Sequence, residues 1–248
     1  MNAFAPRLRI FAGPNGSGKS TIKDMLLPQW LGTYVNADEI ETLLKLHGKI
    51  DLGRYGIAAT QADISAFLAG SGLATRPEFQ GLVGTWNLAG DLLRIDASEI
   101  SSYHASILAD FIRHRLVESR NSFTFETVMS SPAKVDFLRK AKAAGYRVYL
   151  YFIATENPEI NVARVRHRVV LGGHGVPERK IVERYFRCLD LLDAAIQVSD
   201  RAYLFDSSEN GRHNWIAEIT SGSDLEIKTD SVPAWFRKTV LSKYDAVG

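Results

Sequence analysis

The chain has 248 residues, of which 46% are hydrophobic and 23% are charged, a composition typical of a soluble globular protein. Its formal net charge of +2 gives no reason to expect bulk binding to nucleic acid or to a membrane surface. The single cysteine, Cys188, excludes an internal disulfide and a cysteine-rich zinc site. The sequence has no signal-peptide stretch at its start and no apolar run long enough to cross a membrane, so we expect a cytoplasmic protein.

The first predicted elements are a strand over residues 8–12, a glycine-rich loop, and a helix that ends before Pro28. The loop reads Gly-Pro-Asn-Gly-Ser-Gly-Lys-Ser over residues 13–20 and fits the phosphate-binding pattern G-x-x-x-x-G-K-[ST] at every fixed position. Glycines let backbone N–H groups point at phosphate oxygens, Lys19 can reach the β- and γ-phosphates, and the Ser20 hydroxyl can bind Mg²⁺. The alternative, a glycine-rich turn with a chance lysine, does not explain the flanking strand and helix. The expected nucleotide-binding residues are Gly13, Pro14, Asn15, Gly16, Ser17, Gly18, Lys19, Ser20 and Thr21.

A second strand over residues 34–36 leads into a helix over residues 38–47 that ends at Gly48. Asp38 therefore follows a strand, at the edge of the sheet where ligands bind in this class of fold. A carboxylate at that position can accept the proton of an attacking hydroxyl or hold Mg²⁺ through water. The alternative is an aspartate that only favours the first turn of its helix.

Residues 48 to about 100 interrupt the alternation of strands and helices. They contain several glycines, but also Phe79 and Trp86 and too much other apolar content for a disordered linker. We therefore expect an insertion that packs on the core of one domain covering residues 1–248.

A helix over residues 102–118 precedes a strand over residues 122–129, and Ser131-Pro132 begins the next helix, which Gly145 ends. Glu126 and Thr127 lie at the end of that strand. A carboxylate beside a hydroxyl suits hydrogen bonding to a hydroxylated acceptor or indirect Mg²⁺ binding. A polar strand end without a function is the alternative.

After a strand over residues 146–154, an arginine-rich segment at about 160–187 is predicted to form a mobile lid of two helices joined at Gly172-Gly173. Arg164 and Arg168 are four residues apart and therefore share a helix face. The planar guanidinium suits stabilisation of charge on a transferring phosphoryl group. A solvated basic face is the alternative, and some of the arginines belong to it.

The last predicted strands cover residues 202–205 and 215–219, and a short helix follows around residues 233–236. Asp206 follows the first of these strands, where it can assist a metal or begin the loop that holds adenine, although a turn aspartate is the commoner explanation. Strands that alternate with helices predict an α/β fold with a mostly parallel central sheet. With the glycine loop, this pattern predicts a P-loop NTPase fold, a three-layer sandwich with helices on both faces of the sheet, an inserted segment at about residues 48–100 and a helical lid.

Taken together, these segments resemble the zeta-toxin family of P-loop kinases, and more closely the chromosomal zeta-toxin-like proteins of bacteria. The residues that carry the resemblance are the loop with Thr21 at 13–21, Val-Asn-Ala-Asp-Glu-Ile at 35–40, Ser-Phe-Thr-Phe-Glu-Thr-Val-Met-Ser at 122–130, Gly-Tyr-Arg-Val-Tyr-Leu-Tyr-Phe at 145–152, the 164–168 segment with Gly-Gly-His-Gly-Val-Pro at 172–177, and Tyr-Leu-Phe-Asp-Ser at 203–207. The resemblance covers most of residues 8–210.

The resemblance implies an ATP-dependent kinase with a nucleoside-kinase-like core, in which the inserted segment at about residues 48–100 lies on the acceptor side. It implies that Lys19 and Ser20 serve the nucleotide and Mg²⁺. It implies that Asp38 is the base that acts on an acceptor hydroxyl. It also implies acceptor contacts from Glu126 and Thr127. The lid arginines are implied at Arg164 and Arg168, and Arg184 is the next candidate. The best-known members phosphorylate UDP-N-acetylglucosamine, so the implied acceptor is a sugar-nucleotide-like or related metabolite. An antitoxin protein is the implied partner.

The chain departs from the family pattern directly after Asp38. The toxins continue there with an arginine and then a His-Pro element, whereas this chain reads Glu39-Ile40-Glu41-Thr42. The acceptor and toxicity therefore do not transfer with the resemblance. The alternatives are a regulatory NTPase or nucleotide-binding module and the toxin partner of a toxin–antitoxin pair. A GTPase is disfavoured because no Asn-Lys-x-Asp motif is present.

Overall fold

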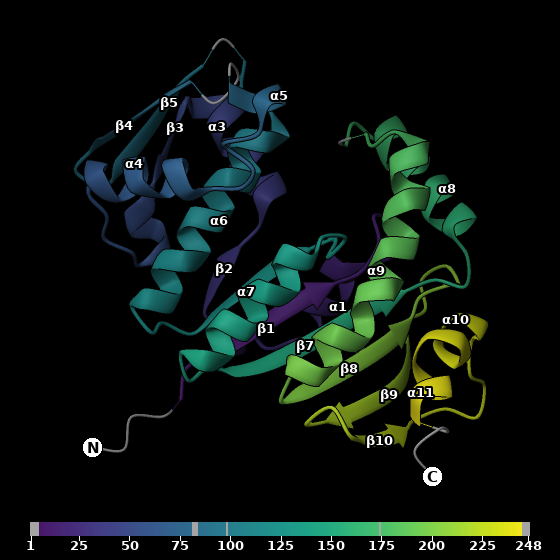
Figure 1. Ribbon diagram of the computed structural model, residues 1–248. Helices are drawn as coiled ribbons and strands as arrows, with labels where there is room; N and C mark the ends of the chain where they lie inside the picture. Colours follow the sequence, from purple (N-terminus) through teal and green to yellow (C-terminus); the bar gives the residue numbers. More distant parts are fainter. Residues whose placement is uncertain (1–4, 81–83, 98, 174, 245–248) are drawn as a thin grey trace. The chain divides into compact units, whose positions relative to one another are not determined.

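The computed structural model describes residues 5–80, 84–97, 99–173 and 175–244. The chain divides into two compact units (Figure 1). The core unit comprises Met1–Leu31 and Thr124–Gly248, and the inserted unit comprises Gly32–Phe123. The single-domain organisation expected from the sequence stays a prediction.

The core unit is built on the central β-sheet, in which its strands follow the order β10-β9-β8-β7-β1-β6. Strands β1, β7 and β8 are parallel, whereas β9 and β10 add antiparallel pairs at one edge. The mostly parallel α/β sheet predicted from the sequence is therefore confirmed. The strands are β1 (Arg7–Ala12), β6 (Phe123–Thr127), β7 (Arg147–Ala154), β8 (Arg201–Asp206), β9 (Asn214–Thr220) and β10 (Asp224–Ile227).

Alternating side chains on these strands build a core on both faces of the sheet. On one face, Phe11 and Ile153 pack against Ile22 of α1. On the opposite face, Phe125 makes an edge-to-face contact with Phe137 of α7, and α7 packs beside α9 (Figure 1). The helices of this unit are α1 (Lys19–Asp24), α2 (Pro28–Leu31), α7 (Pro132–Ala143), α8 (Pro158–Val170), α9 (Glu178–Val198), α10 (Ala234–Phe236), η2 (Arg237–Leu241) and α11 (Ser242–Tyr244).

Two local expectations need correction in the core unit. Pro28 does not only end the preceding helix: α1 already ends at Asp24, and Pro28 is the first residue of α2. This is a favourable position for proline because the first helical N–H has no partner within the helix. Strand β10 was not predicted, since its four residues are too few to give a clear strand signal and three of them are exposed. Among the described residues, none of the helices combines the length and the apolar character needed to span a membrane.

The inserted unit combines helices with a separate antiparallel sheet of order β3-β5-β4. Strands β4 and β5 form a hairpin whose turn contains Gly90 at φ 61°. Trp86 and Leu93 are buried in this unit, and α3 packs against α6. Its elements are β2 (Thr33–Val35), α3 (Ala37–His47), β3 (Lys49–Asp51), η1 (Leu52–Tyr55), α4 (Gln61–Gly70), α5 (Pro77–Gln80), β4 (Thr85–Ala89), β5 (Leu92–Asp96) and α6 (Ser102–Glu118).

Candidate functional site

The loop over residues 13–18 connects β1 to α1 at the carboxyl edge of the parallel strands. Gly13 has φ 146°, and a Cβ atom there would lie 2.0 Å from the carbonyl oxygen of Ile153. Gly18 has φ 90° and is the N-cap residue of α1. Only glycine fits both positions without strain, so the glycines of the motif are required by backbone geometry and by close packing on β7.

Lys19, the first residue of α1, folds back over this loop. Its side chain is buried, and Nζ donates hydrogen bonds to the carbonyl oxygens of Gly13 at 3.0 Å and Pro14 at 2.9 Å. These bonds hold the ammonium group inside the curve of the loop. The arrangement positions a cation where the phosphate groups of a nucleotide are expected to bind.

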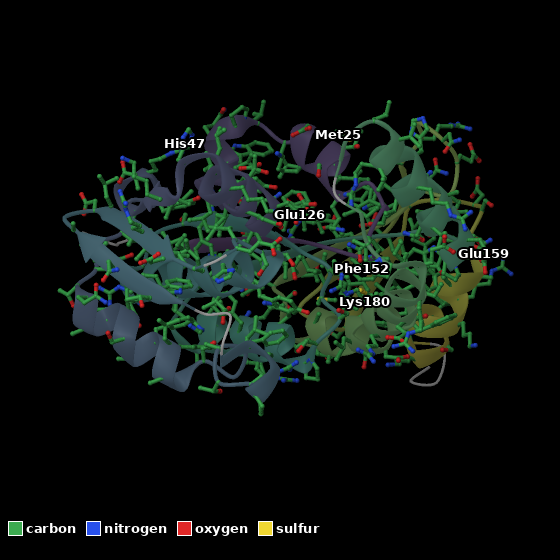
Figure 2. All side chains as sticks on the ribbon, turned by 90° about the horizontal axis from the view of Figure 1, so that it is seen from above. Met25, His47, Glu126, Phe152, Glu159 and Lys180 are labelled. Atoms are coloured by element: carbon green, nitrogen blue, oxygen red, sulfur yellow. The ribbon has the colours of Figure 1, made fainter. Side chains whose placement is uncertain are left out.

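Ser20 and Glu126 meet at the same edge of the sheet. The Ser20 hydroxyl lies 3.3 Å from each carboxylate oxygen of Glu126, which is the labelled residue near the end of β6 in Figure 2. The pair places oxygen ligands of the kind Mg²⁺ prefers beside the loop. The described part of the chain contains no cluster of three or more His, Cys, Asp or Glu side chains that could hold a metal. A metal here would therefore depend on Ser20, Glu126, water and phosphate oxygens.

Thr127 and Asp38 have different surroundings. The Thr127 hydroxyl accepts a hydrogen bond from the N–H of Met129 at 3.3 Å and so shapes the turn after β6. Asp38 lies in the inserted unit, in the first turn of α3, where its N–H donates to Oδ1 of Asn36 at 2.8 Å. Its carboxylate is exposed. The acceptor-binding role of both residues stays a prediction.

Arg164 on α8 and Arg184 on α9 both lie near the glycine loop. Arg164, on α8, donates to Oγ of Ser207 at 3.2 Å and to the carbonyl oxygen of Glu209 at 3.2 Å. Arg184, on α9, donates to Oδ1 of Asn15 in the loop at 3.4 Å. Burial lowers the pKa of Arg164, against the opposing effect of nearby Asp206. The guanidinium group nevertheless stays charged at neutral pH, since its pKa starts far above 7.

Arg168 packs instead against Gly173, in the turn between α8 and α9. Its carbonyl oxygen accepts a hydrogen bond from the N–H of Gly173 at 2.9 Å, and a Cβ at Gly173 would lie 2.6 Å from its Cγ. Other arginines of the segment form solvent-exposed ion pairs: Arg166 with Glu178, and Arg179 with Glu183. The basic face therefore divides between loop contacts and solvated ion pairs. Glu159 and Lys180, labelled in Figure 2, lie in the first turns of α8 and α9.

Asp206 is held by structural hydrogen bonds. Its carboxylate accepts from the N–H of Ser208 at 3.0 Å, from the Ser208 hydroxyl at 2.9 Å and from the indole Nε1 of Trp235 at 2.7 Å. These bonds shape the turn after β8 and attach α10 to it. The turn interpretation of Asp206 therefore accounts for its contacts.

His213 and Asn161 also adjoin the loop, although the sequence analysis did not select them. A Cβ at Gly18 would lie 2.8 Å from Cε1 of His213, and Nδ2 of Asn161 donates to the carbonyl oxygen of Asn15 at 2.7 Å. Burial lowers the pKa of His213, and the charge of Arg164 lowers it further, so the imidazole is neutral at pH 7. The sequence feature that could have pointed to His213 is its place in the chain, since it directly precedes β9 and follows the turn at the carboxyl end of β8.

Part of the chain matches the sequence model of a known protein family. Residues 89–209 match the sequence model of the family described as Zeta toxin. Over this segment the chain resembles the zeta-toxin family. The matched segment contains Glu126, Thr127, Arg164 and Arg168, but it does not reach the nucleotide loop or Asp38.

The individual proteins that this chain resembles are distant in sequence. An uncharacterized protein of Haemophilus influenzae is 32% identical over 72 residues, which are 29% of this chain and 51% of that protein. The solved AvrRxo1-ORF1:AvrRxo1-ORF2 structure with sulphate ions has 17% identity and a TM-score of 0.50, covering 94% of this chain and 63% of that chain. The PezAT toxin–antitoxin structure of Streptococcus pneumoniae has 14% identity and a TM-score of 0.47, covering 100% of this chain and 88% of that chain. The AvrRxo1 likeness supports the fold.

Proposed function

We propose that the protein is an ATP- and Mg²⁺-dependent kinase that transfers the γ-phosphate to a hydroxyl group of a small metabolite. The observation that carries this proposal is the convergence of Lys19, Ser20 and Glu126 at one glycine loop, with Arg184 bonded to Asn15 of that loop. The match of residues 89–209 to the zeta-toxin family model supports the same reaction class.

The loop residues would bind and orient the nucleotide. The backbone of residues 13–18 and the ammonium group of Lys19 hold phosphate oxygens, and Ser20 with Glu126 holds the metal directly or through water. When bound, Mg²⁺ neutralises charge on the phosphates as transfer proceeds. Because Glu126 lies beside Ser20, we favour a role in holding the metal for Glu126 over the acceptor contact implied by the family resemblance.

The remaining groups would act on the transferring phosphate and the acceptor. Arg164 and Arg184 stabilise negative charge that develops on the transferring group. Asp38 orients the acceptor hydroxyl and accepts its proton late in the reaction. A sugar-nucleotide-like or related metabolite is the acceptor class that the family resemblance suggests.

The direct test is incubation of the full chain with ATP, Mg²⁺ and a bacterial metabolite extract, followed by mass spectrometry. We expect at least one metabolite to gain the mass of a single phosphate, in step with ADP formation. Formation of ADP and inorganic phosphate without any phosphorylated metabolite would favour the regulatory NTPase instead.

Glu126→Gln is expected to raise the Mg²⁺ concentration needed for half-maximal activity by about tenfold or more, the scale seen when a group that supports a metal ligand is lost. The reason is that the amide keeps the size of the side chain but removes the negative charge beside Ser20. Titration of activity with Mg²⁺ at saturating acceptor measures the effect, and Glu159→Gln on the exposed start of α8 is the control. A raised KM for the acceptor with an unchanged Mg²⁺ requirement would show instead that Glu126 contacts the acceptor.

Arg164→Ala is expected to lower kcat by about 10²-fold or more, the scale of a lost charge-stabilising group. Arg168→Ala is expected to have a smaller effect, because Arg168 contacts the glycine turn rather than the nucleotide loop. Steady-state kinetics gives kcat and KM for ATP separately, and Arg179→Ala provides an exposed control. If Arg164→Ala keeps a near-normal kcat, the catalytic arginine is Arg184.

An antitoxin is the proposed protein partner. The support comes from the family and from the AvrRxo1-ORF1 relative, whose structure was solved together with ORF2. Co-expression with the product of an adjacent small reading frame, followed by size-exclusion chromatography, tests for a stable complex. Separate elution of the two proteins would contradict the proposal.

A further inference from the structure

The inserted unit contains a cavity of about 340 Å³ that none of the roles above uses. Its lining comes from β2, α3 and η1, and it includes Thr33, Tyr34, Glu39, Leu43, Arg54 and Tyr55. The volume lies at the lower end of the range for small-molecule sites, which is about 300–1,000 Å³. A cavity of this size takes a metabolite or one part of it, not a macromolecule.

Hydroxyl groups and aromatic rings form a fixed wall of the cavity. The Tyr34 hydroxyl accepts a hydrogen bond from Nδ2 of Asn36 at 2.9 Å. Burial raises the pKa of Tyr55 to about 12, so its hydroxyl remains protonated at neutral pH. The Thr33 hydroxyl donates to the carbonyl oxygen of Tyr55 at 3.4 Å and so connects β2 to η1. Such a wall suits a ligand that presents hydroxyl groups and an apolar ring face.

Two opposite charges complete the lining. Arg54 and Glu39 both act on the pKa of Tyr55, which Arg54 lowers and Glu39 raises, so both charges lie near the Tyr55 hydroxyl. The Arg54 side chain is exposed and takes part in none of the hydrogen bonds or ion pairs found among the described residues. A guanidinium group binds carboxylates and phosphates in paired hydrogen bonds, whereas a carboxylate accepts bonds from ligand hydroxyls.

We propose that this cavity binds the phosphate acceptor, and that the acceptor is an anionic, polyhydroxylated metabolite of monosaccharide size, of the sugar phosphate or sugar acid class. The proposal rests on the kinase function proposed above. Glu39 of the lining directly follows Asp38, the residue expected to act on the acceptor hydroxyl, in the first turn of α3. Arg54 holds the anionic group, and Glu39 with the tyrosine and threonine hydroxyls holds the sugar hydroxyls.

Direct binding tests the site without any catalysis. Saturation-transfer NMR on the full chain, in the absence of nucleotide, compares glucose 6-phosphate, gluconate, glucose and inorganic phosphate as probes. We expect the two anionic sugars to bind at least tenfold more tightly than glucose or inorganic phosphate, and Arg54→Ala to remove that preference. Arg94→Ala, an exposed arginine on β5 outside the lining, keeps it. Thermal unfolding of both variants checks that they remain folded.

Three results would overturn the site: anionic sugars that bind no better than glucose, inorganic phosphate that binds as tightly as they do, or an Arg54→Ala variant with wild-type affinity. The transfer assay then separates the site from the reaction. We expect the phosphorylated product to carry an anionic group besides the added phosphate, and Arg54→Ala to raise the acceptor KM at an unchanged KM for ATP. Binding of the anionic sugars without transfer to any metabolite would refute the kinase function and leave the binding site standing.

Discussion

Lys19→Ala is expected to abolish ATP-dependent phosphate transfer and to weaken ATP binding while the protein remains folded. The ammonium group is held in the curve of the loop by the carbonyl oxygens of Gly13 and Pro14, and it is the side-chain cation of the motif that reaches the β- and γ-phosphates. Calorimetry measures ATP affinity, and mass spectrometry of the metabolite extract measures transfer.

Two further variants make the Lys19 experiment decisive. Lys19→Met keeps most of the buried stem and removes only the charge, so a shared loss of activity in both variants cannot be attributed to packing. Lys23→Ala, in the same helix, removes a lysine that pairs with Asp24 and should leave transfer unchanged. Wild-type turnover in a folded Lys19→Ala protein would refute the nucleotide site and with it the kinase function.

Asp38→Asn is expected to lower phosphate transfer by about 10²-fold or more, the scale typical of lost general-base catalysis. ATP affinity is expected to stay within a few-fold of wild type, because the proposed phosphate contacts come from the loop around Lys19 and not from α3. The amide preserves side-chain size, and the helix start remains capped by Asn36. The experiment pairs calorimetry for ATP with a transfer rate measured at saturating ATP.

The control for Asp38 is Asp96→Asn, an exposed aspartate at the end of β5 in the same unit. Transfer at the wild-type rate in Asp38→Asn would leave Asp38 as a residue that only favours the start of its helix. Complete loss of ATP binding would instead assign Asp38 to the metal site, and the base would then have to be sought elsewhere.

Local sequence patterns predicted helices in both units. The helix expected over residues 102–118 has those bounds in α6, and Ser131-Pro132 provides the N-cap and first helical residue of α7. Caps, prolines and helical periodicity act within a few residues, so one sequence suffices to read them. The β4–β5 hairpin was not predicted, although its two-residue turn at Gly90-Asp91 is a local signal. The pairing of β3 with β5 spans the 40 residues between Asp51 and Leu92, which carry no local signal of that pairing.

The sequence by itself determined the glycine-loop motif, the α/β class and the resemblance to the zeta-toxin family, because each depends on residue order over a short span or on several matched segments. Only the tertiary structure decided that Glu126 faces Ser20, from which it is separated by 106 positions. It also decided that Arg164 and Arg168, one helical turn apart, have different neighbours, and that His213 packs on Gly18. The physical reason is that packing brings together side chains from distant elements, and spacing along one chain does not encode those distances.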